Sequence, residues 1–126
     1  MVDILTVDDS ASMRQMIKFT LENAGFNVFE ASNGEEAFEW AKSNNTPDLI
    51  LADVNMPKMD GITLLKHLRA LKNYEEVPIL ILTTDSSQDK KTQGKGSGAT
   101  GWIVKPFNPE QLVDTIQKVM KKNKEN

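Results

Sequence analysis

The sequence predicts a doubly wound α/β domain, in which helices cover both faces of a parallel β-sheet. Short apolar runs rich in branched residues recur along the 126 residues, and stretches with helical spacing separate them. Two of these runs, 49–52 and 79–82, contain only apolar residues, which is typical of central parallel strands buried on both sides. Together they indicate a strand–helix unit repeated five times.

Five strands are predicted over residues 4–7, 27–31, 49–52, 79–82 and 101–104. Because the crossovers between parallel strands are right-handed, we expect the flavodoxin-like strand order 2-1-3-4-5.

The helices between the strands carry start and stop signals. The first has mostly apolar residues at 13, 16, 17, 20, 21 and 24, which share one face, and Gly25 is suited to end it. Asn33, Asp60 and Asn108 are predicted to cap the second, third and last helices, with Pro109 in the first turn of the last.

The fourth helical stretch, 85–98, is weakened by glycine. Gly94 and Gly96 lie in its expected interior, where each costs roughly 1 kcal/mol relative to alanine. We therefore expect a short, frayed or mobile helix that Gly98 ends.

Composition disfavours several classes of function. Fifteen Lys and Arg residues against 18 Asp and Glu give a formal charge of −3 without a large basic field, so no nucleic-acid partner is expected. The absence of cysteine and the single histidine, His67, exclude disulfides, thiolate nucleophiles and multi-histidine zinc sites. Because no signal peptide or membrane-spanning run is recognisable, we expect one cytoplasmic domain over residues 1–126, without membrane contact and monomeric by default.

Residues suited to chemistry follow four of the predicted strands. Asp8 and Asp9 follow the first, Asp53 the third, Thr83 the fourth and Lys105 the fifth. Ligands of open α/β sheets bind at the carboxyl ends of the strands, and strands 1, 3, 4 and 5 are neighbours in the expected order. Three carboxylates, a hydroxyl and an ammonium are therefore predicted to meet in one crevice.

Such a cluster of carboxylates needs a counter-ion, because like charges about 4 Å apart repel by roughly 4 kcal/mol at an effective dielectric near 20. All the side-chain ligands on offer are hard oxygens, which favours Mg²⁺. A carboxylate beside Mg²⁺, a hydroxyl and a lysine is also what phosphoryl transfer to aspartate requires.

Each of these residues also has an ordinary structural explanation. Asp8 and Asp9 are suited to cap the first helix, Asp53 to form a turn, Thr83 to a strand and Lys105 to a solvated surface. Taken alone, each explanation is at least as good as the functional one. The arrival of all of them at adjacent strand ends favours a shared site.

Four segments carry a family resemblance. They are Val7-Asp8-Asp9, residues 49–61 with Asp53 and the string Met-Pro-Lys-Met-Asp-Gly, Leu82-Thr83, and residues 98–107 ending in Lys105-Pro106-Phe107. In this order and together they resemble the receiver domain of two-component response regulators, in particular stand-alone chemotaxis receivers of the CheY type. The resemblance spans essentially the whole chain.

The resemblance implies that Asp53 is the phosphoacceptor. It also implies a Mg²⁺ site made of Asp9, Asp53 and the backbone carbonyl of Asn55, with Asp8 acting through water.

The same resemblance assigns the residues that read the phosphoryl group. Thr83 and Lys105 would contact it, and the Lys105–Pro106 peptide bond would be cis. Trp102 stands where the family usually has tyrosine or another aromatic that changes rotamer together with Thr83 on activation. Asn55 and Asp85 stand where family members tune hydrolysis of the phosphate.

Partners follow from the resemblance as well. A histidine kinase or a small phosphodonor would supply the phosphoryl group. The signal would pass to a separate effector protein on the surface of the fourth helix, fifth strand and fifth helix. A motor switch, a phosphate sink and a non-motility pathway remain open.

The rival classes of function fit the residues less well. An aspartate-nucleophile phosphatase would want Asp-x-Asp after the first strand and a cap domain, and Asp8 and Asp9 would repel the flavin phosphate of a flavodoxin. An interaction module that has lost phosphorylation would not need Asp53, Thr83 and Lys105. We therefore expect no enzyme activity beyond the protein's own phosphorylation and dephosphorylation.

Overall fold

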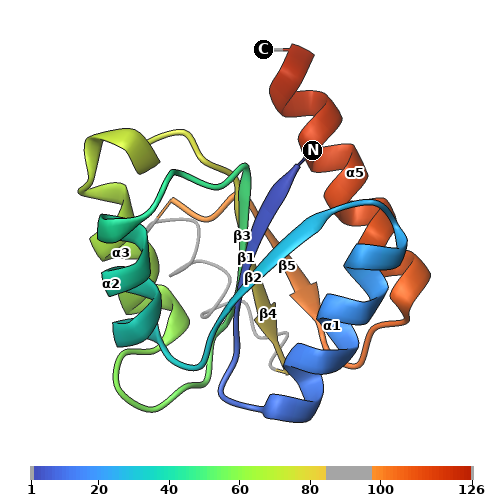
Figure 1. Ribbon diagram of the computed structural model, residues 1–126, viewed down its shortest axis with the longest axis horizontal. Helices are drawn as coiled ribbons and strands as arrows, with labels where there is room; N and C mark the ends of the chain where they lie inside the picture. The colour runs from blue at the N-terminus through green and yellow to red at the C-terminus, as the bar shows by residue number, and fades with distance from the viewer. Residues whose placement is uncertain (1, 85–97, 126) are drawn as a thin grey trace.

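The computed structural model describes residues 2–84 and 98–125 and contains a five-stranded parallel sheet (Figure 1). The strand order is β2-β1-β3-β4-β5, which confirms the predicted topology. The strands are β1 (Asp3–Val7), β2 (Asn27–Ala31), β3 (Leu49–Asp53), β4 (Ile79–Thr83) and β5 (Gly101–Val104). Three of them are one residue longer than predicted, so that Asp53 and Thr83 are the last residues of β3 and β4.

Helices cover both faces of the sheet. In the described residues they are α1 (Ala11–Asn23), α2 (Gly34–Ser43), α3 (Gly61–Arg69), the 3₁₀ turn η1 (Lys72–Tyr74) and α5 (Pro109–Glu125). Figure 1 shows α2 and α3 side by side on one face and α1 and α5 on the other. The predicted fourth helix, with Gly94 and Gly96, falls largely on 85–97 and lies outside the described residues. Within the described ranges, every helix is too short or too polar to cross a lipid bilayer.

Three helices begin directly after the residues predicted to cap them. Asn33 and Asp60 accept hydrogen bonds from the backbone N–H groups three residues later, and Asn108 forms reciprocal bonds with Gln111. Gly25, with φ +94°, ends α1 as predicted. The side chain that caps the start of α1 is Ser10, which leaves the Asp8 and Asp9 side chains free of that role.

The core lies on both faces of the sheet, because successive residues of a strand point to opposite sides. Leu5 and Ile50 pack against α2 and α3, whereas Ile4 and Leu51 pack against α1 and α5. Every residue of β3 and β4 is buried, as expected for central strands. Burial of each large aliphatic side chain contributes about 1.5–3 kcal/mol, so the strands that end in Asp53 and Thr83 are firmly held.

Candidate functional site

The residues predicted to share a crevice leave the sheet at the same edge. In the parallel register, Val7 pairs with Ala52, Asp53 with Leu82 and Thr83 with Val104. The residues that follow β1 and β5, and the last residues of β3 and β4, are therefore brought to the carboxyl end of the sheet. This is where open α/β sheets bind their ligands.

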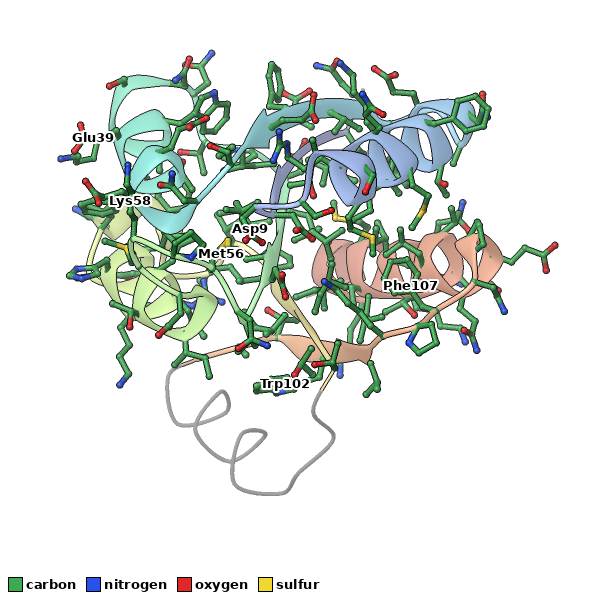
Figure 2. The ribbon with its side chains drawn as sticks, turned by 90° about the horizontal axis from the view of Figure 1, so that it is seen from below. Asp9, Glu39, Met56, Lys58, Trp102 and Phe107 are labelled. Atoms are coloured by element: carbon green, nitrogen blue, oxygen red, sulfur yellow. The ribbon has the colours of Figure 1, made fainter. Side chains whose placement is uncertain are left out.

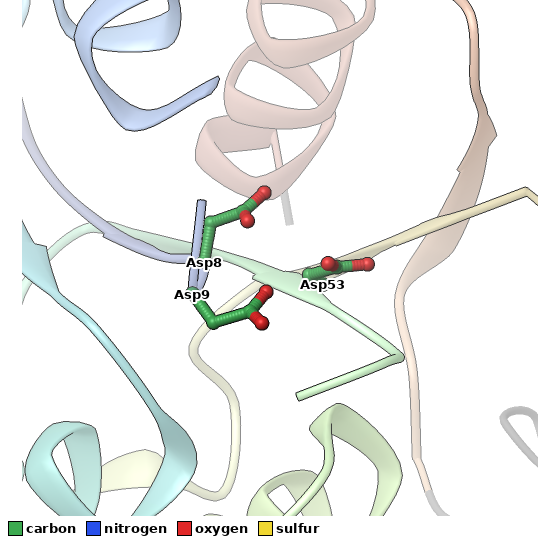
Figure 3. Close-up of side chains that lie close together, drawn as sticks. All are labelled: Asp8, Asp9 and Asp53. Atoms are coloured by element: carbon green, nitrogen blue, oxygen red, sulfur yellow. The ribbon is translucent and has the colours of Figure 1, made fainter. Parts of the chain in front are cut away.

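Three carboxylates converge at this edge. Asp8, Asp9 and Asp53 each offer one oxygen atom, and these oxygens lie within 4.8 Å of one another (Figure 3). Asp8 and Asp53 are buried, whereas Asp9 is exposed. The cluster is therefore anchored in the protein and open to solvent through Asp9.

Lys105 supplies positive charge to this pocket. Its Nζ lies 3.3 Å from Oδ2 of Asp53 and 3.5 Å from Oδ2 of Asp8. The Lys105–Pro106 peptide bond is cis, as predicted, and the Lys105 backbone N–H donates to the Thr83 carbonyl oxygen at 2.7 Å. Among the described residues, one ammonium lies beside three carboxylates, which leaves the pocket with an excess of negative charge.

Burial raises the pKa of the Asp53 carboxyl above its ordinary value. The nearby Lys105 opposes this effect, whereas the carboxylate of Asp8 adds to it. Hydrogen bonds from Lys105 and from the backbone N–H of Asn55 also favour the charged form, without reversing the net shift. The folded protein thus holds Asp53 in a place where its negative charge is not fully compensated.

The donor set of the pocket fits a divalent cation. Oδ2 of Asp8 is buried and accepts no hydrogen bond from the described residues, since the Lys105 ammonium at 3.5 Å makes only an ion pair with it. Carboxylate oxygens are the ligands that Mg²⁺ prefers, and an added cation would offset their mutual repulsion. Asp8, Asp9 and Asp53 are the residues that could hold it.

Asn55 reaches the pocket through its backbone. Its side chain is exposed, and its N–H donates to Oδ1 of Asp53 at 3.4 Å. The loop after β3 therefore helps to orient the Asp53 carboxylate.

Thr83 and Trp102 occupy different surroundings. Thr83 is fully buried at the end of β4, next to the strand that leads to Lys105. Trp102, on β5, pairs with Ile81 of β4 and packs, half-buried, against the side of the core that faces α2 and α3. Its indole Nε1 has no hydrogen-bond partner among the described residues. Figure 2 shows Trp102 at the β5 edge, away from Asp9, so the indole is not part of the carboxylate cluster.

One residue at the site was not predicted. Arg14, on α1, donates from Nη1 to the carbonyl oxygen of Asp8 at 2.6 Å, and its Nε lies 3.5 Å from Oε1 of Glu30 on β2. It therefore holds the peptide between Asp8 and Asp9. A basic residue in the first turns of a helix, where the helix dipole disfavours cations, was the available signal.

Comparisons with known proteins agree with these features. The family model of the response regulator receiver domain matches residues 4–117. A chemotaxis protein CheY homolog of Campylobacter jejuni is 38% identical over 118 residues, which cover 93% of this chain and 91% of that protein. The transcriptional regulatory protein SrrA of Staphylococcus aureus is also 38% identical, over 95% of this chain but only 48% of its own length.

A solved structure matches the fold closely. The chemotaxis protein CheY4 of Vibrio cholerae superposes with a TM-score of 0.90 and 50% sequence identity, covering 94% of this chain and 98% of that one. The sheet order, the acidic cluster at its carboxyl edge and these matches lead to one conclusion: the chain belongs to the response regulator receiver domain family.

Proposed function

We propose that this protein is a phosphorylation-dependent switch of chemotaxis signalling, in which Asp53 accepts a phosphoryl group from a histidine kinase. The observation that carries the proposal is the meeting of Asp8, Asp9 and Asp53 within 4.8 Å, with the Lys105 ammonium 3.3 Å from Asp53. Membership of the receiver family, whose members are signalling proteins rather than ordinary enzymes, supports it.

Asp53 is the acceptor that the geometry favours among the three carboxylates. Its Oδ2 faces the Lys105 ammonium and its Oδ1 accepts from Asn55, so both oxygens are held in fixed directions. Asp8 is held in a similar way, with Oδ1 accepting from the Ser10 N–H at 2.9 Å, but its side chain is only 1% exposed against 8% for Asp53 and is less accessible to a donor. A carboxylate that attacks phosphorus must be oriented as well as charged.

Asp9, Asp53 and the backbone carbonyl of Asn55 would hold Mg²⁺, with Asp8 acting through water. When bound, Mg²⁺ supplies positive charge that offsets both the repulsion among the carboxylates and the charge on the phosphoryl oxygens. Oδ2 of Asp8 is buried and accepts no hydrogen bond within the described ranges, which supports a cation in this pocket.

The transfer itself is a direct displacement. An Asp53 carboxylate oxygen forms a bond to phosphorus while the bond from phosphorus to the donor's imidazole nitrogen breaks, and the imidazole keeps the bonding electron pair. With a small donor such as acetyl phosphate, the bond that breaks is phosphorus to oxygen, and acetate leaves. Lys105 and Thr83 would contact the phosphoryl oxygens of the product.

The added charge, about −1.5 to −2, would bias a two-state surface. Thr83 and Trp102 are the proposed switch residues. A half-buried indole whose N–H has no hydrogen-bond partner in the described residues supports a second rotamer for Trp102. Slow loss of the phosphate to water would reset the protein, at a rate tuned by Asn55 and by Asp85, which lies outside the described residues.

A downstream protein would bind on the side of β5 and α5. A groove of about 540 Å³ there is lined by residues 102–107 and by Gln111, Asp114, Thr115 and Lys118. The fourth helix, which the proposal also assigns to this surface, lies outside the described residues. A cytoplasmic monomer without nucleic-acid or membrane contacts remains part of the proposal.

The names of the relatives support a chemotaxis role. The CheY homolog of Campylobacter jejuni and the CheY4 structure of Vibrio cholerae match over more than nine-tenths of both chains. A phosphate sink or a receiver in another pathway is the alternative, and the match to SrrA, a transcriptional regulator, favours keeping it open.

Phosphorylation of the full chain tests the proposal. With acetyl phosphate and Mg²⁺, the protein should gain phosphate that resists acid but is lost in alkali or hydroxylamine, and Asp53→Asn should gain none. Asp48→Asn is the matched control, because it makes the same change of charge at an exposed residue before β3, where an amide oxygen can also accept the Asp3 N–H. Label that persists in Asp53→Asn, or that forms equally without Mg²⁺, would refute the proposal.

A further inference from the structure

We infer that Gly34, at the start of α2, is a positioning residue for phosphorylation of Asp53. Its missing side chain lets the loop between β3 and α3, residues 54–60, rest directly on the first turn of α2. This contact sets the direction of the Asn55 amide that donates to Asp53. The inference rests on the proposed function of Asp53 and Mg²⁺.

The loop has a backbone conformation that it would not hold alone. Lys58 has φ +52° and Met59 has φ +87°, two consecutive residues with side chains in the left-handed region. Residues other than glycine adopt this region rarely, and they persist there when the surrounding structure holds them. Neighbouring elements must therefore keep the loop in place.

The first turn of α2 provides that support. A Cβ atom added to Gly34 would overlap the carbonyl oxygen of Met59 and would lie 2.9 Å from the Met59 Cβ. Beside it, the Glu35 N–H donates to the Lys58 carbonyl oxygen at 3.2 Å. Figure 2 draws Lys58 close to α2. Two stretches of backbone thus touch with no side chain between them.

The other end of the loop is closed against β3. The Gly61 N–H donates to the Val54 carbonyl oxygen at 3.0 Å, and a Cβ on Gly61 would overlap the Asp53 carbonyl oxygen. Asn55 lies between this fixed base and the apex that rests on Gly34. Because the base is fixed to Asp53 itself, a displacement at the apex must be taken up by the residues between, Asn55 included.

Gly34→Ala is the variant that removes the close contact. The obstacle is a backbone carbonyl rather than the end of a flexible side chain, so the loop must move. We expect Mg²⁺ to bind roughly tenfold more weakly, the lower end of the loss seen when a group that orients a metal ligand is removed. The Mg²⁺ concentration for half-maximal phosphorylation by acetyl phosphate should rise by the same factor.

Ala41→Gly is the matched control for a general loss of stability. Ala41 is buried near the other end of α2, and glycine within a helix destabilises it without touching residues 54–60. Calorimetric titration of each full-length variant with MgCl₂ measures the affinity, and circular dichroism reports the fold. Ala41→Gly should lower the melting temperature and leave the Mg²⁺ affinity within twofold of the parent.

A second pair of variants tests the same contact at Glu35. Glu35→Pro replaces the N–H that donates to Lys58 with a ring carbon, so the hydrogen bond is lost and the Lys58 carbonyl must move away. Glu35→Gln makes the same change of charge but keeps the N–H. Mg²⁺ should bind more weakly to Glu35→Pro than to Glu35→Gln. If Gly34→Ala does not fold, this pair decides the inference.

Met59→Gly should rescue Gly34→Ala in part, because glycine removes the Met59 Cβ and frees the backbone to turn aside. The effects of the two substitutions on Mg²⁺ affinity should therefore not add.

The outcomes separate the inference from the proposed function. Unchanged Mg²⁺ affinity in folded Gly34→Ala, equal weakening in Ala41→Gly, or no difference within the Glu35 pair would each overturn the inference alone. A parent protein that neither binds Mg²⁺ nor accepts phosphate would overturn the proposed function, and the inference with it.

Discussion

Two regions of this protein hold partly buried charges, but only one of them supplies enough partners for its charge. At the end of α3, the Arg69 guanidinium donates to the carbonyl oxygens of Tyr74, Val77 and Gly98 at distances from 2.6 to 3.1 Å. These bonds join α3, the turn after it, the segment before β4 and the segment before β5. Burial lowers the pKa of the guanidinium, but arginine remains charged, and its donors are aimed at neutral acceptors.

The pocket at the carboxyl end of the sheet shows the reverse. Asp8, Asp9 and Asp53 meet a single ammonium, from Lys105, and Oδ2 of Asp8 accepts no hydrogen bond in the described part of the chain. A buried charge with well-placed partners stabilises the fold, whereas uncompensated charge costs stability and is kept where a ligand will compensate it.

Backbone conformation separates the two regions in the same way. Beside Arg69, the left-handed position is filled by Gly98, with φ +95°, which adopts it without strain. Beside the pocket, Lys58 and Met59 adopt positive φ although they carry side chains. Strain, like uncompensated charge, is found on the side of the molecule proposed to do the chemistry.

The largest expected effect on stability comes from Arg69→Met. It removes the donor of the carbonyl groups of buried Tyr74, half-buried Val77 and exposed Gly98, so we expect a loss of roughly 3 kcal/mol in the free energy of unfolding. Thermal denaturation followed by circular dichroism measures it. Mg²⁺ affinity should stay near that of the parent, and a large fall in affinity would show that the two regions are not independent.

Mg²⁺ should stabilise the parent by about 2.7 kcal/mol at a concentration one hundred times its dissociation constant. The physical reason is that the cation binds the folded pocket and not the unfolded chain. Denaturant unfolding with and without MgCl₂ measures this gain, which Asp9→Asn should reduce. Equal stabilisation of Asp9→Asn would place the cation elsewhere.

Asp53→Asn should stabilise the metal-free protein by a few degrees in melting temperature. The raised pKa of Asp53 means that the folded state disfavours its charge, through burial first and then through Asp8, and asparagine removes that charge. The advantage of the variant should be absent below the unfolded pKa of about 3.9, where the parent carboxyl is protonated in both the folded and the unfolded state. It should grow as the pH rises through the folded pKa and then level off.

Melting curves of both proteins in EDTA, from about pH 4 to pH 7, test this sign. A parent that is more stable than Asp53→Asn at neutral pH would mean that the ion pair with Lys105 outweighs the cost of burial.

The smallest effect is expected from Lys58→Gly. Lys58 is exposed, and glycine relieves its left-handed backbone, a gain of about 1 kcal/mol that the greater freedom of the unfolded chain reduces to about 0.5 kcal/mol. Gly98→Ala is the opposite change and should destabilise the protein, because alanine is strained at φ +95° and its Cβ would lie 3.2 Å from Nε of Arg69. Chemical denaturation of both variants checks the signs.

Much of the fold followed from local pattern. The runs 49–52 and 79–82 marked the central strands, and Asn33, Asp60 and Asn108 marked the helix starts, because these signals depend on spacing and on side chains within a few residues. The meeting of Asp8, Asp9, Asp53 and Lys105 could be predicted because the end of each strand is itself a local feature.

Other features depend on contacts between distant segments, and no local pattern identifies the partner. Arg69 reaches Gly98, 29 residues later, and Arg14 reaches Glu30 on a neighbouring strand. The cap of α1 by Ser10 rather than by Asp8 or Asp9 is a choice among adjacent candidates, all of them good caps.

The sequence by itself determined the order of strands and helices, the residues at each strand end and the kind of chemistry they suit, since these follow from periodicity and from the ligands that each side chain offers. Tertiary structure alone decided which charges are compensated, as with Arg69, which are left in excess, as with Asp53, and where Gly34 must lie against the loop. The reason is that electrostatic interactions and steric contacts depend on distances in space, and a few ångströms between distant segments decide whether a charge has a partner or a Cβ has room.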